Sequence, residues 1–182
     1  RKAMEPNQLG RLEDMKEFLR EDAETLRRER RKKADAIYAD RGQVIKNDLE
    51  TVLKGLADGK GDGRLVISCL KSSYITGSFD FYIAFYAGEP FVEEEPDSAY
   101  YSMAVFWDGI GEDLERMGKK LRRKFIRVMS SETEEILRWY MEGFHGEWQG
   151  IFREILEGIG EEKHVDVLFG GYMDRLETVG RV

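Results

Sequence analysis

The stretch LADGKGDGRLVI has some of the oxygen ligands and glycines of a calcium-binding loop. Counted from Asp58, Asp62 falls at position 5 and Gly63 at position 6 of the EF-hand pattern. Lys60, however, places a cation at position 3, and Cys69 replaces the bidentate glutamate of position 12. An EF-hand also needs a second helix, whereas RLVISCL is rich in β-branched residues and predicts a strand. We therefore expect a turn that joins a helix to a strand, and no metal.

Two other residue patterns raise the question of metal or covalent chemistry. Glu142 and His145 have the ExxH spacing that puts a carboxylate and an imidazole on one helical face. A di-iron bundle needs two such pairs plus two further glutamates on other helices, so this spacing alone does not indicate a metal site. Cys69 would need a neighbouring base to act as a nucleophile, and the sequence places none beside it. We expect a surface histidine and a buried, unreactive thiol.

Catalytic motifs are scarce elsewhere. The chain has no GxxxxGK[ST], GxSxG or HExxH, and no GxGxxG after a predicted strand. Asp80, Glu89 and Asp108 lie on or near predicted strand ends, where active-site carboxylates often occur, but no second catalytic group stands at a telling distance. We expect no catalytic residue and no cofactor, and an enzyme using these carboxylates is only the third hypothesis for function.

The segregation of charge is more informative. Residues 116–129 carry seven basic and no acidic side chains, and residues 27–33 carry six basic residues and one glutamate. Their net charges are +7 and +5, so the remaining chain carries −19 within the overall −7. Such blocks create local electric fields that the net charge conceals. An acidic stretch, Glu93, Glu94 and Glu95, mirrors them in a predicted loop.

Several interpretations of the basic segments stay open. The cations can pair internally with nearby glutamates, and those toward a helix C-terminus are favoured by the helix dipole. They can instead contact phosphate backbones, an acidic protein partner or an anionic membrane surface. The candidate contact residues for a partner or nucleic acid are Arg27, Arg28, Arg30, Arg31, Lys119, Lys120, Arg122, Arg123, Lys124 and Arg127. Glu93, Glu94 and Glu95 form a candidate acidic contact loop.

Length and composition limit the class of protein. The 182 residues suit one domain, or one domain plus an extension, with a core that needs neither disulfides nor metal. A single cysteine is typical of a reducing compartment, so we expect a cytoplasmic location. No apolar run approaches the 18 residues that suggest a membrane span.

These residues must be positioned by three groups of elements. Residues 1–57 predict a helical arm, as one long helix or two with a break near 39–42. Its apolar stripe recurs at helical spacing, fades through the basic run and resumes beyond it. So narrow a stripe rarely stands alone in water, so we expect it to pack on a helix of the same molecule or of a second copy. The stripe comprises Leu9, Leu12, Met15, Leu19, Ala23, Leu26, Ile37, Tyr38, Val44, Ile45 and Leu49.

Residues 58–182 predict the core domain of an α+β protein, a small antiparallel sheet of three to four strands at about 64–107, packed by C-terminal helices. Thr76-Gly77 predicts a tight hairpin turn, YYSMAVFW a third strand, and Phe91-Val92 a short edge strand. A last helical segment is expected around 165–176, although Gly170-Gly171 weakens it. In the core, the predicted strand face of Phe79, Phe81, Ile83 and Phe85 should meet Trp139, Phe144, Trp148 and Phe152.

The sequence thus favours a non-enzymatic binding or regulatory module that acts through charged helical surfaces and the acidic loop. The alternative is a nucleic-acid-binding accessory protein that uses the basic helix 116–129 and the basic run 27–33. A protein partner, or self-association through the N-terminal helices, follows from the first hypothesis.

Overall fold

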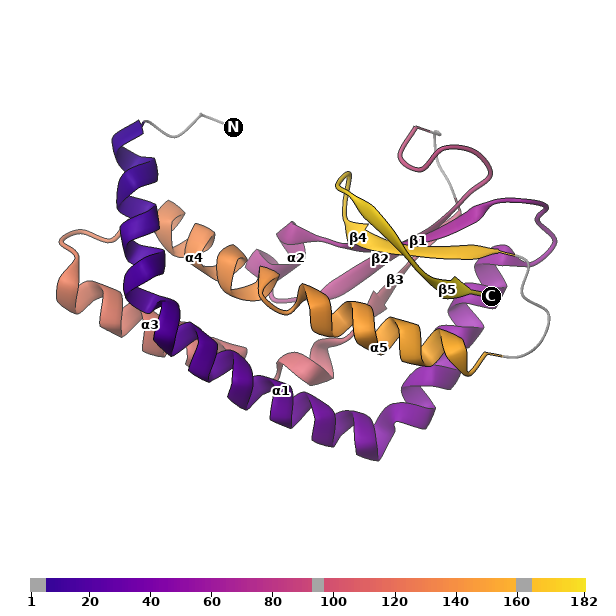
Figure 1. Ribbon diagram of the computed structural model, residues 1–182, viewed down its shortest axis with the longest axis horizontal. Helices are drawn as coiled ribbons and strands as arrows, with labels where there is room; N and C mark the ends of the chain where they lie inside the picture. The colour runs from indigo at the N-terminus through magenta and orange to yellow at the C-terminus, as the bar shows by residue number, and fades with distance from the viewer. Residues whose placement is uncertain (1–5, 93–96, 160–164) are drawn as a thin grey trace. The chain divides into compact units, whose positions relative to one another are not determined.

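The computed structural model describes residues 6–92, 97–159 and 165–182, with side chains from residue 10 onward (Figure 1). The chain forms two compact units, the first from Arg1–Ala36 and Phe106–Phe144 and the second from Ile37–Val105 and His145–Val182. The predicted division into a helical arm at 1–57 and a core domain at 58–182 stays a prediction. Both units take part of the N-terminal helix, because it continues across residue 36.

Helix α1 (Pro6–Ala57) is one uninterrupted helix, with no break at 39–42. Its stripe does not vanish at the basic run. Leu19, Ala23 and Leu26 are buried, and Arg27 and Arg30 take the next buried positions at helical spacing. Two arginines therefore continue the buried stripe through the segment where the apolar residues are interrupted. Beyond them, Ile45, Leu49 and Leu53 are buried in the second unit.

The rest of the first unit is helical. It contains the end of the short 3-10 helix η1 (Ala104–Trp107), then α3 (Ile110–Lys124) and α4 (Ser130–Glu142). Helix α3 starts after Gly109, whose positive φ of 80° is the left-handed conformation that glycine adopts without cost. At α4, the Glu132 carboxylate accepts a hydrogen bond from the Met129 amide, which caps the start of the helix at Met129. Phe144 packs on Trp107 and Tyr140 within this unit.

The second unit contains a mixed sheet of five strands in the order β3-β2-β1-β4-β5. The α+β class is confirmed, but the strand count exceeds the predicted three to four, and the sheet is not wholly antiparallel. Strands β1 and β4 pair in parallel, and every other neighbouring pair is antiparallel. The strands are β1 (Arg64–Cys69), β2 (Asp80–Tyr86), β3 (Ser98–Ser102), β4 (Asp166–Gly171) and β5 (Leu176–Arg181).

The additional strands come from the segment predicted to be helical around 165–176. Val165, Val167 and Phe169 are buried and alternate with half-buried neighbours, which is the period of a strand. Gly170 lies so close to the Arg175 carbonyl that a Cβ atom would overlap it. The apolar residues at helical spacing misled the prediction because both periods fit the same few positions.

Three other local predictions were wrong. No tight turn joins the first two strands, because a short helix, α2 (Lys71–Thr76), lies between them and ends at Gly77. The third strand stops at Ser102, and η1 takes up the apolar end of YYSMAVFW. Phe91 and Val92 lie in a turn, not in an edge strand.

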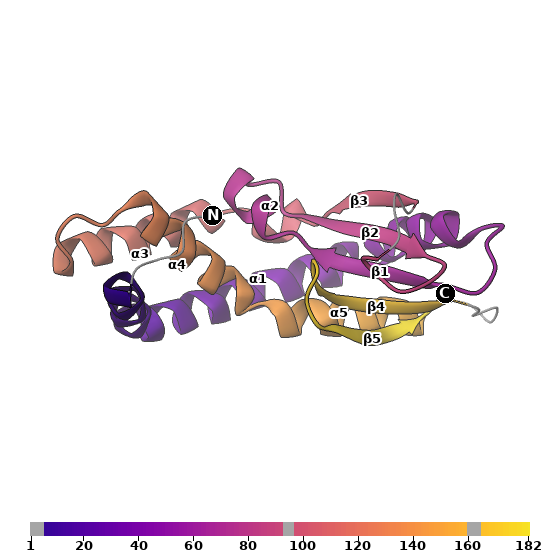
Figure 2. The ribbon, with the colours of Figure 1, turned by 90° about the horizontal axis from the view of Figure 1, so that it is seen from above.

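The aromatic core of the second unit partly matches the prediction. Helix α5 (His145–Glu157) lies along one face of the sheet beside β5 (Figure 2). The Phe81 ring packs edge-on against Trp148 and Phe152 of α5, with centroids 5.2 and 5.1 Å apart. Trp139 belongs to the first unit, where its ring faces the Arg27 guanidinium at 5.0 Å.

Candidate anion-binding surface

Arg27 of the basic run is an internal residue. Its guanidinium donates to the backbone carbonyls of Tyr140 (3.0 Å) and Trp139 (2.9 Å) and pairs with Glu24 at 2.8 Å. Those two carbonyls belong to the last turn of α4, where no further helical amide can satisfy them. A cation at this position also favours the negative end of the helix dipole. Arg27 therefore caps α4 from α1 and is not offered to a partner.

Arg30 is engaged in the same way. It donates to the Asp113 carboxylate of α3 at 2.8 and 3.2 Å and to the Asp108 carbonyl. The same carboxylate accepts the Tyr140 hydroxyl at 2.8 Å. Burial, followed by the bond to Asp113, raises the pKa of Tyr140 above its ordinary value. The network joins α1, α3 and α4 and keeps the Tyr140 phenol neutral.

The remaining cations of the basic run differ in exposure, and Lys32 and Lys33 are exposed. Arg31 is half-buried and donates to the Gly143 carbonyl at 3.4 Å. Arg28 is exposed to solvent. Since Arg27 and Arg30 point into the unit, the run presents only part of its predicted charge to solvent.

Two lysines of α3 also have partners within the unit. Lys119 forms an ion pair of 2.8 Å with Glu115, one turn earlier, and this hydrogen bond lowers the pKa of Glu115. Lys120 pairs with Asp22 of α1. Both lysines are therefore partly neutralised, which is the internal pairing that the sequence left open.

The last turn of α3 and the loop after it are different. Arg122, Arg123, Lys124 and Arg127 are exposed, and none forms an ion pair with a carboxylate in the described part of the chain. Residues 122–128 line an open hollow of about 400 Å³. Two apolar side chains accompany the cations, since Ile126 is 81% exposed and Met129 is 42% exposed. We call these six residues, Arg122, Arg123, Lys124, Ile126, Arg127 and Met129, the α3–α4 loop surface.

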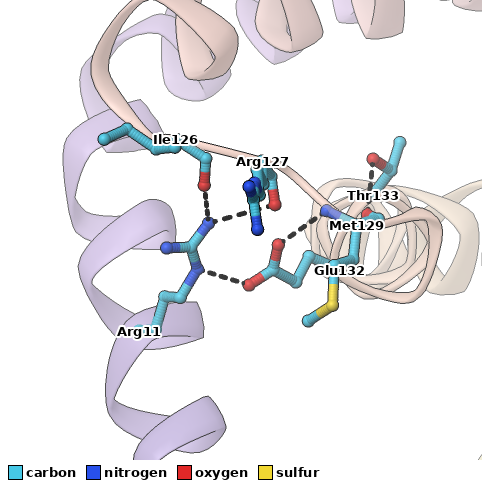
Figure 3. Close-up of polar contacts among 6 residues, drawn as sticks. All are labelled: Arg11, Ile126, Arg127, Met129, Glu132 and Thr133. Atoms are coloured by element: carbon cyan, nitrogen blue, oxygen red, sulfur yellow. Dashed lines mark hydrogen bonds and ion pairs between the residues drawn. The ribbon is translucent and has the colours of Figure 1, made fainter.

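Arg11 of α1 contacts the loop between α3 and α4 (Figure 3). Its guanidinium donates to the Ile126 carbonyl at 2.7 Å, to the Arg127 carbonyl at 3.4 Å and to the Glu132 carboxylate at 2.6 Å. Glu132 is fully buried, and its second oxygen accepts the Met129 amide at 2.8 Å. A carboxylate in the first turn of α4 is also favoured by the helix dipole. Both ends of the loop are therefore fixed by one ion pair, of which only the carboxylate is fully buried.

Lys124, the lysine of this loop surface, contacts an aromatic ring within the first unit. The Lys124 ammonium lies 4.2 Å from the centroid of the Phe18 ring of α1, a cation–π geometry. Such a contact orients the lysine but leaves its charge unneutralised. Lys124 therefore still contributes to the positive field of the α3–α4 loop surface.

Glu142, His145 and Cys69 are the residues whose patterns raised the question of metal or covalent chemistry. Glu142 ends α4 and His145 begins α5, so the two are not on one continuous helix as their spacing suggested. Cys69 is buried, which raises its pKa to about 12 and keeps the thiol protonated. In the described residues, no three histidine, cysteine, aspartate or glutamate side chains are grouped as a metal site.

Of the three strand-end carboxylates, Asp80 and Glu89 belong to the second unit and Asp108 to the first. Asp80 opens β2, whereas Glu89 follows the far end of that strand and borders an open hollow of about 570 Å³ beside Asp62 and Arg64. Asp108 is exposed in the first unit, and its contact with Arg30 is made by its carbonyl and not by its carboxylate.

The glycine-rich loop after α1 leads directly into β1. Lys60 is the cation at position 3 of the calcium-binding pattern. Its ammonium group pairs with Asp97 and lies 4.8 Å from the centroid of the Phe85 ring. Gly63 sits against the Phe85 ring and the Tyr86 carbonyl, where a Cβ atom would clash. These contacts give the loop a packing role. The predicted acidic contact loop, Glu93 to Glu95, lies outside the described residues.

Sequence reasoning missed Arg11. Glu132 appeared only among several glutamates available to the basic segments, and Arg11 lies 121 positions away from it. No local pattern marks a pair so distant in the chain.

Comparison with family models, with curated proteins and with solved structures gives no match, so the function must be argued from the site. Across the described residues, no helix is both long and apolar enough to cross a bilayer.

Proposed function

We propose that the chain is a non-enzymatic binding module that docks a protein partner on the α3–α4 loop surface. The observation that carries the proposal is the exposure of Ile126 within a group of four cations that have no ion-pair partners in the described structure. A partner that presents an apolar side chain surrounded by carboxylates would complement both features. Charge complementarity of this kind steers association and selects among partners.

The apolar residue supplies affinity that charge alone does not. Burying a side chain the size of isoleucine contributes roughly 1.5–3 kcal/mol. The contacts from Arg11 hold the loop before any partner arrives, so little conformational entropy is lost on docking. Exposed ion pairs, in contrast, contribute at most about 1 kcal/mol each and are screened by salt. We therefore expect Ile126 to be the anchor and the arginines to set specificity.

Affinity capture from the native host, followed by direct binding of the recovered protein, tests this proposal. Ile126→Ser and Arg123→Glu should each weaken binding of the recovered partner at least tenfold. Arg28→Glu makes the same charge change at an exposed site of α1 and serves as the matched control. Equal loss of binding in Arg28→Glu would mean that general charge attraction, and not the loop, retains the partner.

Nucleic acid is the second candidate ligand, favoured by the same unpaired cations. Binding of duplex DNA or RNA should then fall steeply with salt, with a slope set by the number of phosphates neutralised. The engagement of Arg27 and Arg30 inside the unit leaves fewer cations for a phosphate track than the sequence suggested. Salt titrations with duplex and single-stranded probes distinguish this candidate from a protein interface.

Self-association through α1 is a separate proposal. Leu19 and Leu26, the residues expected at such a seam, are buried within a single chain, so a dimer formed by α1 would use its exposed side. Light scattering over a range of concentrations measures the molar mass directly. A cytoplasmic location likewise stays a proposal and is tested by fractionation of the native host.

A further inference from the structure

The cations of the α3–α4 loop surface form a compact group and not a track. All four fall within residues 122–127 and line one hollow of about 400 Å³. Two neighbouring cations of α1 and α3 are engaged, Arg30 with Asp113 and Lys120 with Asp22, whereas Arg116 of α3 is exposed outside the hollow. A nucleic-acid backbone spreads its charges along the strand, so it suits an extended row of cations. A compact group suits one small anion of high charge.

The backbone adds a donor to this group. The Ile126 carbonyl accepts from Arg11, and a trans peptide places the amide N–H opposite its carbonyl. The Arg127 N–H therefore points away from Arg11, and no described residue accepts a hydrogen bond from it. Backbone amides exposed in a turn are common donors to anions.

Arg127 also has an unusual conformation. Its φ of 54° lies in the left-handed region, which is costly for a residue other than glycine. Such strain persists only where surrounding contacts impose it, and it occurs often at binding sites. Here the Arg127 carbonyl accepts a hydrogen bond from Arg11, which holds the peptide in place. A glycine would adopt this backbone conformation at lower cost. The presence of an arginine therefore points to a role for its side chain.

In the described residues, no carboxylate forms an ion pair with the four cations of this hollow. Glu132 is the first acidic residue after the loop in the sequence, and it is buried and paired with Arg11 at 2.6 Å. Glu115, two turns before Arg122 on α3, is paired with Lys119 and also interacts electrostatically with Arg122. Arg122 is therefore partly compensated, whereas Arg123, Lys124 and Arg127 have no carboxylate partner in the described residues.

We infer that the α3–α4 loop surface binds a phosphate monoester carried by a phosphorylated side chain of the protein partner, an inference that rests on the proposed function. A phosphate monoester carries about −1.5 to −2 charge near pH 7 and three strong acceptor oxygens. Arginine guanidinium groups match those oxygens with paired donors, and Arg122, Arg123 and Arg127 supply three of them. The Arg127 amide donates to the same anion, and Lys124 adds a point charge. Ile126 and Met129 contact partner residues beside the phosphate, a contact that a bare anion would leave unused.

The direct test uses small probes and the intact chain. Amide chemical shifts are followed by NMR while phenyl phosphate, dimethyl phosphate or benzoate is added at constant ionic strength. Phenyl phosphate should give a saturable shift of the Arg127 amide and bind at least tenfold more tightly than dimethyl phosphate, a monoanionic diester. Benzoate, a monoanion without the tetrahedral oxygens, should bind no better than the diester. A phenyl phosphate titration without a saturable Arg127 shift, or equal binding of all three anions, overturns the inference.

Two variants keep the test independent of folding. Arg127→Gly relieves the left-handed strain and preserves the amide, so the variant should remain folded while its phenyl phosphate affinity falls at least fivefold. Arg28→Gln removes an exposed cation outside the loop and should leave the affinity unchanged. Unchanged affinity in Arg127→Gly would contradict the assignment of that guanidinium to the anion.

Treating the captured partner with a phosphatase separates the inference from the proposed function. Release of the partner by phosphatase, together with its loss in Ile126→Ser, supports both. A partner that is lost in Ile126→Ser but binds equally well after phosphatase treatment leaves the docking surface standing and overturns the phosphate inference. Tighter binding of duplex DNA than of phenyl phosphate at physiological salt would assign the cations to nucleic acid and overturn both.

Discussion

Arg11 and Glu132, 121 positions apart in the sequence, form an ion pair of 2.6 Å that holds the loop between α3 and α4. The Glu132 carboxylate is fully buried, and the Arg11 side chain is about one-third exposed at 35%. One guanidinium thus links three segments of the first unit, since it also donates to the carbonyls of Ile126 and Arg127. The conformation of the α3–α4 loop surface therefore depends on this pair.

Replacing Arg11 with methionine should destabilise the first unit by about 2 kcal/mol, because Glu132 would be left buried without its cation. The partial exposure of Arg11 places the loss below that of a fully buried pair. Chemical denaturation measures the free energy of unfolding. Arg20→Met, which removes an exposed arginine paired only with Glu17 on the surface of α1, is the matched control and should change it by less than about 0.5 kcal/mol.

The same pair predicts a double-mutant result. Glu132→Gln keeps an oxygen to accept the Met129 amide but loses the charge that Arg11 requires. If the two side chains act as a pair, the Arg11→Met/Glu132→Gln double variant should be less destabilised than the sum of the single variants. Strict additivity of the free energies of unfolding would show that Arg11 acts mainly through the loop carbonyls.

Substitution of Arg27 or Arg30 should affect stability before it affects binding. Arg27→Met leaves two carbonyls in the last turn of α4 without a donor, and Arg30→Met leaves Asp113 without its cation. We expect each to cost about 2–4 kcal/mol, the range for breaking buried charged contacts. Arg28→Met lies between them in sequence and is exposed, so thermal unfolding should show almost no change. A large loss in Arg28→Met, equal to the other two, would contradict the assigned orientation of the helix.

Gly143 is required by the position of the Arg27 guanidinium. A methyl group at residue 143 would overlap that guanidinium, which is held by three acceptors and has little freedom to move. Gly143→Ala should therefore destabilise the protein by about 1–3 kcal/mol, as expected for overpacking. Gly150 lies within α5 with open space around it, so Gly150→Ala should stabilise the helix by up to about 1 kcal/mol. Opposite shifts of the melting temperature in the two variants are the expected result.

The second unit should lose stability in alkaline solution through Tyr101. Burial, together with the Asp48 carboxylate, raises the pKa of Tyr101 to about 12. In the unfolded chain the phenol ionises near pH 10. The folded state therefore binds the proton more tightly, and its contribution to stability is present below pH 10 and is lost between pH 10 and about 12. Urea unfolding at a series of pH values should show a shallower decline in Tyr101→Phe than in the unchanged protein.

Periodicity predicted the long helices well, because each residue's neighbours at three and four positions are fixed by the helix itself. It failed for the second unit's last hairpin, where Val165 and Phe169 fit a helical and a strand spacing equally. The choice was made by the parallel pairing of β4 with β1, a contact between segments about a hundred residues apart. Gly170, where a close carbonyl leaves no room for Cβ, was the local signal of that hairpin.

The basic segments show the same division more sharply. The order of residues determined that the chain has two blocks of positive charge, since the net charge of each block depends only on the residues in it. It did not determine which cations face water, because Arg27 and Arg28 differ only in the side of α1 on which they lie. Docking of α3 and α4 buried Arg27 and Arg30 against carbonyls and a carboxylate and left residues 122–127 exposed. The sequence alone fixed the amount of charge, and the tertiary packing decided where that charge is available for binding.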